Sequence, residues 1–318
     1  LIDDMARRDE YALAGTGRGI LGFVNETPSG ATGFLVDNAG GVTDAAFGNR
    51  FMSVGMYVAA INPNSGAIRT SIRKITATAA AGTNVDFDAG TFTGWADNDF
   101  LVQAANSAVT NVIDTSYEHA WMGLMGLVDD NTYLANYFGV VRADVPAYSS
   151  YVQASTGALS TDLIQRVSDI VDQKLGGQVD LILAHHAIRR LIVQLTDADR
   201  RYSGASLAKP DPGTVAFKQG DVPFGDVPVR AIRDFPVNVL MYLDVKDAGL
   251  KEYVSERGKW VDEDGSILAR VGSGTTGRDA FEAWYRMRKQ YFMEYPAYCA
   301  RQDGITGSSV IVQRAAGS

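Results

Sequence analysis

The feature that most constrains the fold of this chain is a change of hydrophobic periodicity along its 318 residues. From about residue 22 to residue 103, short apolar runs are separated by Asn-, Gly- and Pro-containing turns, which is typical of β-strands. Within the run 67–78, isoleucines alternate with arginines, which predicts a strand with one apolar face and one face in water. We therefore expect a compact, barrel-like β unit of about 80 residues.

The pattern changes to α/β after Thr156. Residues 160–175 place apolar side chains at helical spacing, with Ser160 as the predicted N-cap and Gly176-Gly177 as the predicted end. The continuously apolar run VDLILA predicts a short buried strand, and apolar residues at helical spacing predict a second helix after it. The apolar residues of the second helix are Ile188, Leu191, Ile192 and Leu195.

Beyond the second helix the chain is rich in Pro and Gly, so residues 208–228 are predicted to be a long loop. Strands are expected in VPVRAI and VNVLMYL, followed by a hairpin around Gly265. The segment 281–296 is ambiguous. Alternation of Phe281, Ala283 and Tyr285 with charged and larger residues favours a strand, whereas the spacing of its aromatic residues also suits a helix. We predict the strand.

Composition excludes several classes of protein. The chain has 37 acidic and 29 basic residues, and a net charge of −8 argues against gripping duplex DNA by neutralising phosphates. The single cysteine, Cys299, permits no internal disulfide and has the apolar surroundings of a buried thiol. No apolar run approaches the roughly 18 residues of a membrane helix, so we expect a soluble protein. The opening residues have a helical apolar pattern without an initiator Met, which indicates processing or trimming of a longer helix.

The acidic stretch WVDEDGSILAR, residues 260–270, raises the question of a calcium site. Placing Gly265 at position 6 of a calcium-binding loop puts Asp262 and Asp264 at ligand positions, but Trp260 and Val271 then occupy positions 1 and 12. Two essential ligands are missing. Asp-Gly between apolar runs instead predicts a tight turn.

Two glycine-rich stretches resemble nucleotide-binding motifs. Residues 17–22 match G-x-G-x-x-G, but the motif follows a helical pattern instead of a strand, and Pro28 opposes a helix after it. Residues 272–279 approach a P-loop, but Arg278 replaces the lysine and Asp279 replaces the hydroxyl that holds magnesium. We interpret both stretches as connectors.

The histidines and the basic cluster give no site either. His185 and His186 are adjacent and cannot share a helical face, and His119 lacks a partner at metal-ligand spacing. There is no G-x-S-x-G nucleophile elbow, although a dispersed triad or carboxylate pair stays open. The cluster of Arg286, Arg288 and Lys289 among aromatic residues is either a single-stranded nucleic-acid surface or, as we prefer, a charged strand edge.

A family resemblance emerges from the order of these segments. The strand and helix of DLILAHHAIRRLI, the Gly-rich loop, DVPVRAIRDFPVNVLMYLD, the acidic hairpin and the terminal RDAFEAWYRMRKQYFMEYPAYCARQDGIT together resemble tailed-bacteriophage major capsid proteins of the Hong Kong 97 fold. The opening DDMARRDEYALAGTGRG looks like the end of that family's spine helix. The resemblance covers about two-thirds of the chain and contains no catalytic motif.

The resemblance implies an α+β fold with an axial domain and a peripheral domain. In this scheme residues 1–22 end the spine helix, 23–107 form an inserted β unit, 108–179 connect, 180–271 form the axial domain and 272–318 return as a peripheral strand. The β unit departs from the family pattern, and the family's N-terminal arm and extended loop have no counterpart here. A covalent crosslink known in some members is matched by no motif.

The function implied by the resemblance is that of a structural subunit without enzymatic activity. It would assemble with itself into hexamers, pentamers and an icosahedral virion shell, formed in the host cytoplasm around double-stranded DNA that it does not bind specifically. Portal, scaffolding or decoration proteins are possible partners, and no membrane, metal, cofactor or catalytic residue is expected. An encapsulin compartment uses the same fold and is the nearest alternative, whereas an α/β enzyme with a β accessory domain is the alternative from a different class.

Overall fold

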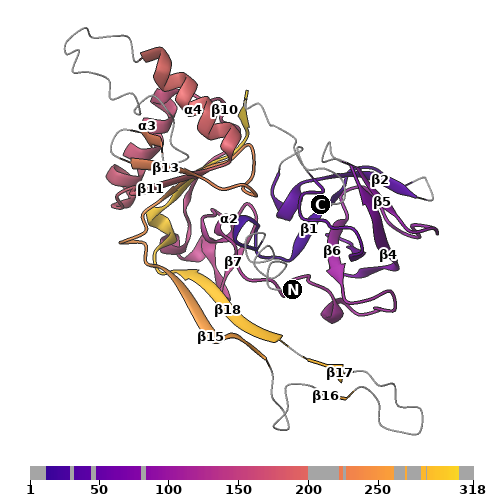
Figure 1. Cartoon of the computed structure of the whole chain (residues 1–318). Coiled ribbons are helices and arrows are strands. Elements are labelled where there is room, and N and C mark those ends of the chain that lie inside the picture. The colour runs from indigo at the N-terminus through magenta and orange to yellow at the C-terminus, as the bar shows by residue number, and fades with distance from the viewer. Residues whose placement is uncertain are drawn as a thin grey trace, which may run out of the picture.

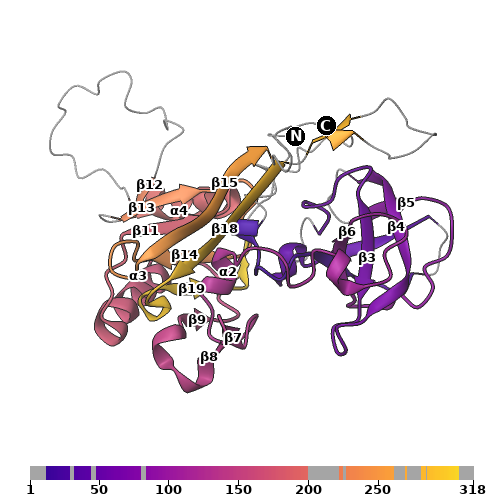
Figure 2. The same cartoon turned by 90° about the horizontal axis from the view of Figure 1, so that it is seen from below.

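The structure is a computed structural model in which three parts can be distinguished: a β-barrel, a mixed sheet with helices on one face, and a two-stranded arm (Figures 1 and 2). It describes residues 12–28, 32–43, 48–79, 84–199, 222–224, 227–260, 269–270, 281–283 and 285–307. Of the opening helical pattern, residues 12–14 are described and are helical.

The barrel is closed by six antiparallel strands in the order β1-β2-β5-β4-β3-β6. The strands are β1 (Ile20–Val24), β2 (Gly33–Asp37), β3 (Tyr57–Ile61), β4 (Ile68–Thr78), β5 (Asn84–Phe87) and β6 (Phe100–Ala104). Aliphatic residues and four stacked or edge-on aromatic rings fill its interior, namely Phe34, Phe87, Phe92 and Trp95. Closure pairs every strand on both sides, so the barrel has no free edge. The β-rich segment predicted from the sequence thus forms a barrel, and its status as an insertion stays a prediction.

The prediction that the arginine face of β4 lies in water is wrong. Arg69 forms an ion pair of 2.8 Å with Asp99, and the side chain of Arg73 is only 11% exposed, with its guanidinium 5.5 Å from the centre of the Phe92 ring. The connection between β5 and β6 folds across this face and supplies both partners. The alternation predicted which side chains share a face, but an arginine can be covered when a carboxylate and a ring lie over it.

The mixed sheet has the strand order β12-β13-β11-β14-β19-β9. Its strands are β12 (Val222–Phe224), β13 (Val227–Ala231), β11 (Leu181–Ala184), β14 (Leu240–Leu243), β19 (Ala300–Gln302) and β9 (Tyr151–Gln153). The pairs β11-β13 and β19-β9 are parallel, and the remaining pairs are antiparallel. Two segments about 150 residues apart therefore meet at one edge of the sheet, where β9 pairs with β19.

Helices α3 (Thr161–Ile170) and α4 (His186–Asp199) cover one face of this sheet (Figure 1). Their buried side chains, among them Ile164, Val167 and Ile188, pack in one cluster with alternate residues of the central strands. The predicted cap is confirmed, because the Ser160 hydroxyl accepts a hydrogen bond of 3.2 Å from the Leu163 N–H. A π-turn (Val171–Leu175) extends α3 to Gly176, whose φ of 76° ends it as predicted.

The strands predicted in VDLILA, VPVRAI and VNVLMYL are confirmed as β11, β13 and β14, and the second helix as α4. The predicted loop is wrong in one place, because β12 pairs with β13 within it. This pairing puts Pro223 of β12, the outermost strand, opposite Pro228 of β13, and a missing N–H costs little at the edge of a sheet or near the start of a strand.

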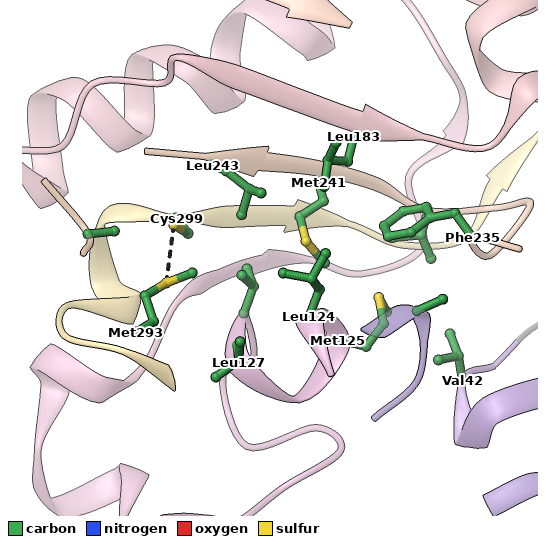
Figure 3. Close-up of a cluster of buried hydrophobic side chains, with 14 of the residues drawn as sticks. Val42, Leu124, Met125, Leu127, Leu183, Phe235, Met241, Leu243, Met293 and Cys299 are labelled. Carbon is green, nitrogen blue, oxygen red and sulfur yellow. Dashed lines mark hydrogen bonds between the residues drawn. The ribbon is translucent and has the colours of Figure 1, made fainter. Parts of the chain in front are cut away.

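The opposite face of the sheet packs on the short helix α2 (Leu124–Leu127) and on the barrel side of the molecule (Figure 3). Leu183, Met241 and Leu243 of the sheet contribute to a cluster that also contains Leu124 and Phe51. The barrel is joined here by a polar contact as well, because the Asn238 side-chain amide donates a hydrogen bond of 2.7 Å to the Thr43 carbonyl. The sheet is therefore buried on both faces, which explains its continuously apolar strands.

The arm consists of β15 (Leu250–Trp260) and β18 (Tyr285–Met293), which pair antiparallel from Leu250↔Met293 to Trp260↔Tyr285. Beyond it, β16 (Ala269–Arg270) pairs with β17 (Phe281–Glu282). The strand predicted for the terminal segment is confirmed. The predicted Asp-Gly turn lies outside the described residues. On either side of it, Trp260 pairs with Tyr285, and Ala269 pairs with Glu282.

Short elements complete the described part of the chain. They are the hairpin β7 (Asn136–Tyr137) and β8 (Val140–Val141), the parallel pair β10 (Gly157–Ala158) and β20 (Ile305–Thr306), and the 3-10 turns Ala39–Gly41, Val112–Asp114, Arg142–Asp144, Pro146–Tyr148 and Pro296–Tyr298. Among the described helices, none is long and apolar enough to cross a membrane.

Candidate assembly surfaces

The arm carries two exposed aromatic side chains. The side chains of Tyr253 and Trp260 on β15 are 62% and 44% exposed. Within the described residues, β15 and β18 pair only with each other, so each strand has one edge without a partner strand. A two-stranded ribbon is marginally stable alone in water, and a free edge is a template for pairing with another chain.

The root of the arm is buried and fixed to the body (Figure 3). Met293 at the end of β18 is 2% exposed, and the Sγ of Cys299 lies 3.5 Å from its sulfur. The Tyr137 hydroxyl donates to the Met293 carbonyl at 2.7 Å and accepts from its N–H at 2.8 Å. Burial raises the pKa of Tyr137 and of Cys299 to about 12, so both stay protonated. Burial of the Cys299 thiol, predicted from the sequence, is confirmed.

Lys289 attaches the middle of the arm to the body. Its ammonium lies 4.6 Å from the ring centre of Trp121 and 3.5 Å from a Glu252 oxygen, and its side chain is 7% exposed. Arg286 and Arg288 on the same strand are exposed. The three cations singled out in the sequence therefore do not form one surface, because successive residues of a strand point to opposite faces.

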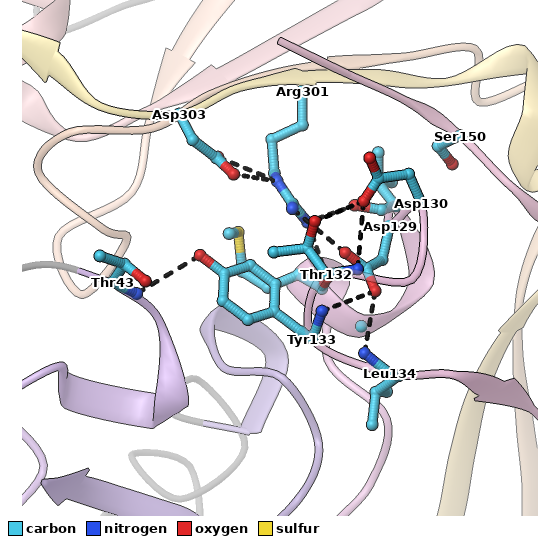
Figure 4. Close-up of polar contacts among 12 residues, drawn as sticks. Thr43, Asp129, Asp130, Thr132, Tyr133, Leu134, Ser150, Arg301 and Asp303 are labelled. Atoms are coloured by element: carbon cyan, nitrogen blue, oxygen red, sulfur yellow. Dashed lines mark hydrogen bonds and ion pairs between the residues drawn. The ribbon is translucent and has the colours of Figure 1, made fainter. Parts of the chain in front are cut away.

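A buried ionic cluster surrounds Arg301 of β19 (Figure 4). Arg301 on β19 is fully buried and donates to the carbonyls of Met125 and Val128 at 3.0 and 2.6 Å. It forms ion pairs of 3.1 Å with Asp129 and 2.9 Å with Asp303. Burial raises the pKa of Asp303, and the positive charge of Arg301 opposes this shift. A guanidinium with this many partners can be buried without an uncompensated charge.

The partners of Arg301 make further contacts within the chain. The second oxygen of Asp129 accepts hydrogen bonds of 3.0 and 2.9 Å from the N–H groups of Tyr133 and Leu134. The Tyr133 ring lies 4.7 Å from the Arg301 guanidinium carbon, and its hydroxyl accepts from the Thr43 N–H at 3.3 Å. The cluster connects β19, the turn after α2 and the barrel side. Its groups are occupied by internal contacts, so we interpret it as structural.

Arg142 forms a second buried centre. It donates to the Asp129 carbonyl at 2.9 Å and also to the carbonyls of Tyr148 and Gly126. Its guanidinium lies 4.9 Å from the Tyr137 ring centre, and burial lowers its pKa. These contacts fix the β7–β8 hairpin, which ends immediately before Arg142. The sequence analysis did not predict that Arg301 and Arg142 are buried. For Arg301, its position directly after the apolar Cys299-Ala300 and two residues before Asp303 could have indicated a buried ion pair.

Among the described residues, a mostly apolar cavity of about 310 Å³ lies between the glycine-rich turn and the barrel. Its walls include Ile20, Leu21, Phe51, Met56 and Trp121. In the predicted G-x-G-x-x-G stretch, Gly19 accepts a hydrogen bond of 2.6 Å from the Ser116 hydroxyl, and the chain then enters β1, a strand. A helix N-terminus facing a phosphate is therefore not formed at this stretch.

The histidines have local structural contacts. His185 precedes α4, and its Nδ1 accepts a hydrogen bond of 3.1 Å from the Ala187 N–H, which is the contact of an N-cap. Burial, reinforced by Arg50, lowers the pKa of His185 to about 4. His119 Nδ1 lies 2.6 Å from the Tyr117 carbonyl.

The remaining sequence candidates fall elsewhere. Asp262, Glu263, Asp264 and Gly265, and the P-loop-like residues 272–279, lie outside the described residues. In the part of the chain that is described, no group of three or more His, Cys, Asp or Glu side chains is arranged to hold a metal ion.

Comparison with known proteins gives limited information. No protein-family model matches the chain, and no curated protein matches it. Among solved structures, the chain is similar to one described as a cyanophage A-1(L) capsid asymmetric unit, with 14% sequence identity and a TM-score of 0.40. The similarity covers 63% of this chain and 63% of that chain, so the chain matches less than two-thirds of that protein's length.

Proposed function

We propose that this chain is a structural subunit that assembles with copies of itself into an icosahedral shell, the major capsid protein of a tailed bacteriophage head. The observation that carries the proposal is the arm. It has two strands of 11 and 9 residues with a buried root, exposed aromatic side chains and unpartnered outer edges. Such a ribbon gains stability when a neighbouring subunit covers it.

The buried sites support a structural role over a catalytic one. Buried charged side chains such as Arg301, Asp129 and Arg142 can be catalytic groups in an enzyme. Here they form hydrogen bonds with backbone carbonyls, with N–H groups and with each other. The order of elements, from β11 and α4 to the arm and β19, follows the order that carries the sequence resemblance to Hong Kong 97-type capsid proteins. In that scheme the barrel is an insertion after the spine helix, and residues 180–271 form the axial domain.

The net charge bears on what the shell would enclose. A net charge of −8 opposes the binding of phosphates, so packaged double-stranded DNA would be a neighbour and not a specific ligand. The proposed location is the virion, after assembly in the host cytoplasm, with portal, scaffolding or decoration proteins as further partners. Titration of the unassembled subunit with random-sequence duplex DNA near physiological salt should give no submicromolar binding.

The test of assembly uses the full chain with its natural N-terminus under native conditions. We expect capsomers or megadalton particles in light scattering and negative-stain images. The double variant Tyr253→Asp, Trp260→Asp should stay a folded, unassembled subunit, because it places charges on the surface that a neighbour would cover. Thr76→Asp, at an exposed position of the barrel strand β4, is the matched control and should still assemble. A monomer for the unmodified chain at every salt and protein concentration would contradict the proposal.

A further inference from the structure

The β7–β8 hairpin presents an apolar tip to solvent. Phe138, Val140 and Val141 are 51%, 38% and 44% exposed, and most residues from 135 to 147 that are exposed are also apolar. Apolar patches that stay exposed on a folded chain commonly mark interaction sites. The tip is small and convex, so it fits a concave partner.

The tip is also strained and rigid. Phe138 has a φ of 46° and Gly139 a φ of 87°, the two positive values of a type I′ turn, in which Asn-Gly is the preferred pair. A phenylalanine in this conformation costs free energy compared with asparagine. The Tyr137 ring packs at 4.8 Å from the Phe138 ring, and Arg142 fixes the other end of the hairpin. A strained aromatic residue on a rigid support is a feature that folding by itself does not require.

The cavity described above has the complementary shape and chemistry. Its volume is about 310 Å³, and an apolar cavity of about 150 Å³ is large enough to bind benzene. There is thus room for a phenyl ring and an adjacent valine. None of the hairpin residues lines this cavity in the same chain, and Ser53 at its margin is exposed.

Both features are attached to the arm. Tyr137 of the hairpin bonds to Met293, and Trp121 in the cavity wall contacts Lys289, so hairpin and cavity both contact β18. A neighbour that covers the arm therefore approaches both. A knob and a socket on different surfaces of one chain give head-to-tail contacts, which form a ring when the rotation from one subunit to the next closes.

We propose that the Phe138 tip of one subunit inserts into the cavity beside Trp121 of the next copy of this chain. The inference rests on the proposed assembly and names one of its contacts. The occupant of the cavity is the Phe138 side chain with its neighbouring valines, and the contact is heterologous.

The first experiment crosslinks the two surfaces. One chain carries Val140→Cys, which keeps the Phe138 ring, a second carries Ser53→Cys, and equal amounts are mixed under assembly conditions and mildly oxidised. Cys299 is fully buried and does not compete. We expect a disulfide-linked heterodimer of the two chains. The pair Val140→Cys with Thr76→Cys, where the second thiol is at an exposed barrel position that does not line the cavity, is the matched control and should crosslink at least tenfold less.

The second experiment relieves the backbone strain at Phe138. Phe138→Asn suits the left-handed conformation better, so the unassembled subunit should unfold at the same or a higher temperature. Removing the ring should nevertheless raise the protein concentration for half-maximal assembly by about tenfold, the effect of losing an interface anchor. Assembly of this variant at the unmodified concentration, or equal crosslinking by the Thr76→Cys control, would overturn the knob-and-socket contact and leave the assembly proposal intact. A failure of the unmodified chain to assemble would overturn both.

Discussion

The barrel and the arm satisfy their backbone hydrogen bonds in opposite ways. In the barrel, six strands close on each other, and side chains such as Leu101 and Ile75 are fully buried inside. In the arm, two strands pair only with each other among the described residues, and Tyr253 and Trp260 are exposed. Both are β-structure, but all barrel strands except β4 have 4 or 5 residues, whereas the arm strands have 11 and 9.

The difference shows that β-structure in this chain serves two purposes. A closed barrel removes the edges that would pair with other chains, so it is complete within one subunit. The arm keeps its edges and depends on its root for position. Substitutions should therefore affect stability strongly in the barrel and at the root, and weakly along the arm, where the effect should appear in assembly.

The largest effect is expected at the buried Arg301 cluster. Arg301→Leu removes the partner of Asp129, which is fully buried, and of Asp303, and should lower the free energy of unfolding by about 3 to 5 kcal/mol. Urea denaturation of the unassembled subunit measures this loss. The control is Arg18→Leu, which breaks the partly exposed ion pair with Glu118 and should cost below about 1 kcal/mol. Equal losses in the two variants would show that the buried cluster does not stabilise the fold more than an exposed ion pair does.

The barrel interior should give the next largest effect. Leu101→Ala on β6 empties space at a fully buried position, so we expect a loss of about 2 to 4 kcal/mol in the free energy of unfolding. Leu35→Ala on β2, where the side chain is 41% exposed, is the matched control and should cost much less. Chemical denaturation compares the two. Similar midpoints would mean that the barrel is not an independent core.

A smaller, pH-dependent effect on stability is expected at the start of α4, outside both the barrel and the arm. The folded pKa of His185, about 4, is below its ordinary value of 6.5, so its contribution to stability is complete above pH 6.5 and is lost as pH falls toward 4. The loss should be on the order of 1 to 2 kcal/mol, allowing for partial exposure. Thermal unfolding of His185→Asn, which keeps a capping acceptor, should lack this dependence; an unchanged pH profile would contradict the assignment.

The smallest effect on stability is expected along the arm. Tyr253→Ser changes a side chain that is 62% exposed, so the free energy of unfolding of the unassembled subunit should change by less than about 0.5 kcal/mol. The same variant should assemble more weakly, as measured by light scattering. A large loss of stability with normal assembly would contradict the view that the arm serves assembly and not the stability of the subunit.

Local patterns in the sequence were sufficient for several elements of the barrel and of the mixed sheet with its helices. Ser160 and Gly176 mark the ends of α3 and its extension because capping depends on residues within one turn. Turn residues separated the barrel strands for the same local reason. The terminal strand β18 was less certain, because its aromatic residues suit two periodicities and only pairing with β15 decides between them.

The candidate surfaces were harder to predict from the sequence. The basic residues of β18 could be named, but only the structure shows that Lys289 turns toward Trp121 while Arg286 and Arg288 face solvent. The cavity combines residues from five separated segments, and the Phe138 tip is recognisable only through its φ and exposure. No periodicity encodes such features.

By itself, the sequence determined the segments of the barrel, the α/β alternation, the single buried thiol and the acidic balance, because these depend on composition and on neighbours within a few residues. Only the tertiary structure decided that Arg301 and Arg142 are buried, that Arg73 is covered, and that β9 meets β19. Those outcomes depend on partners more than 10 residues away, such as Asp129 for Arg301. The free energy of burying a charge is set by such partners and not by the residue itself.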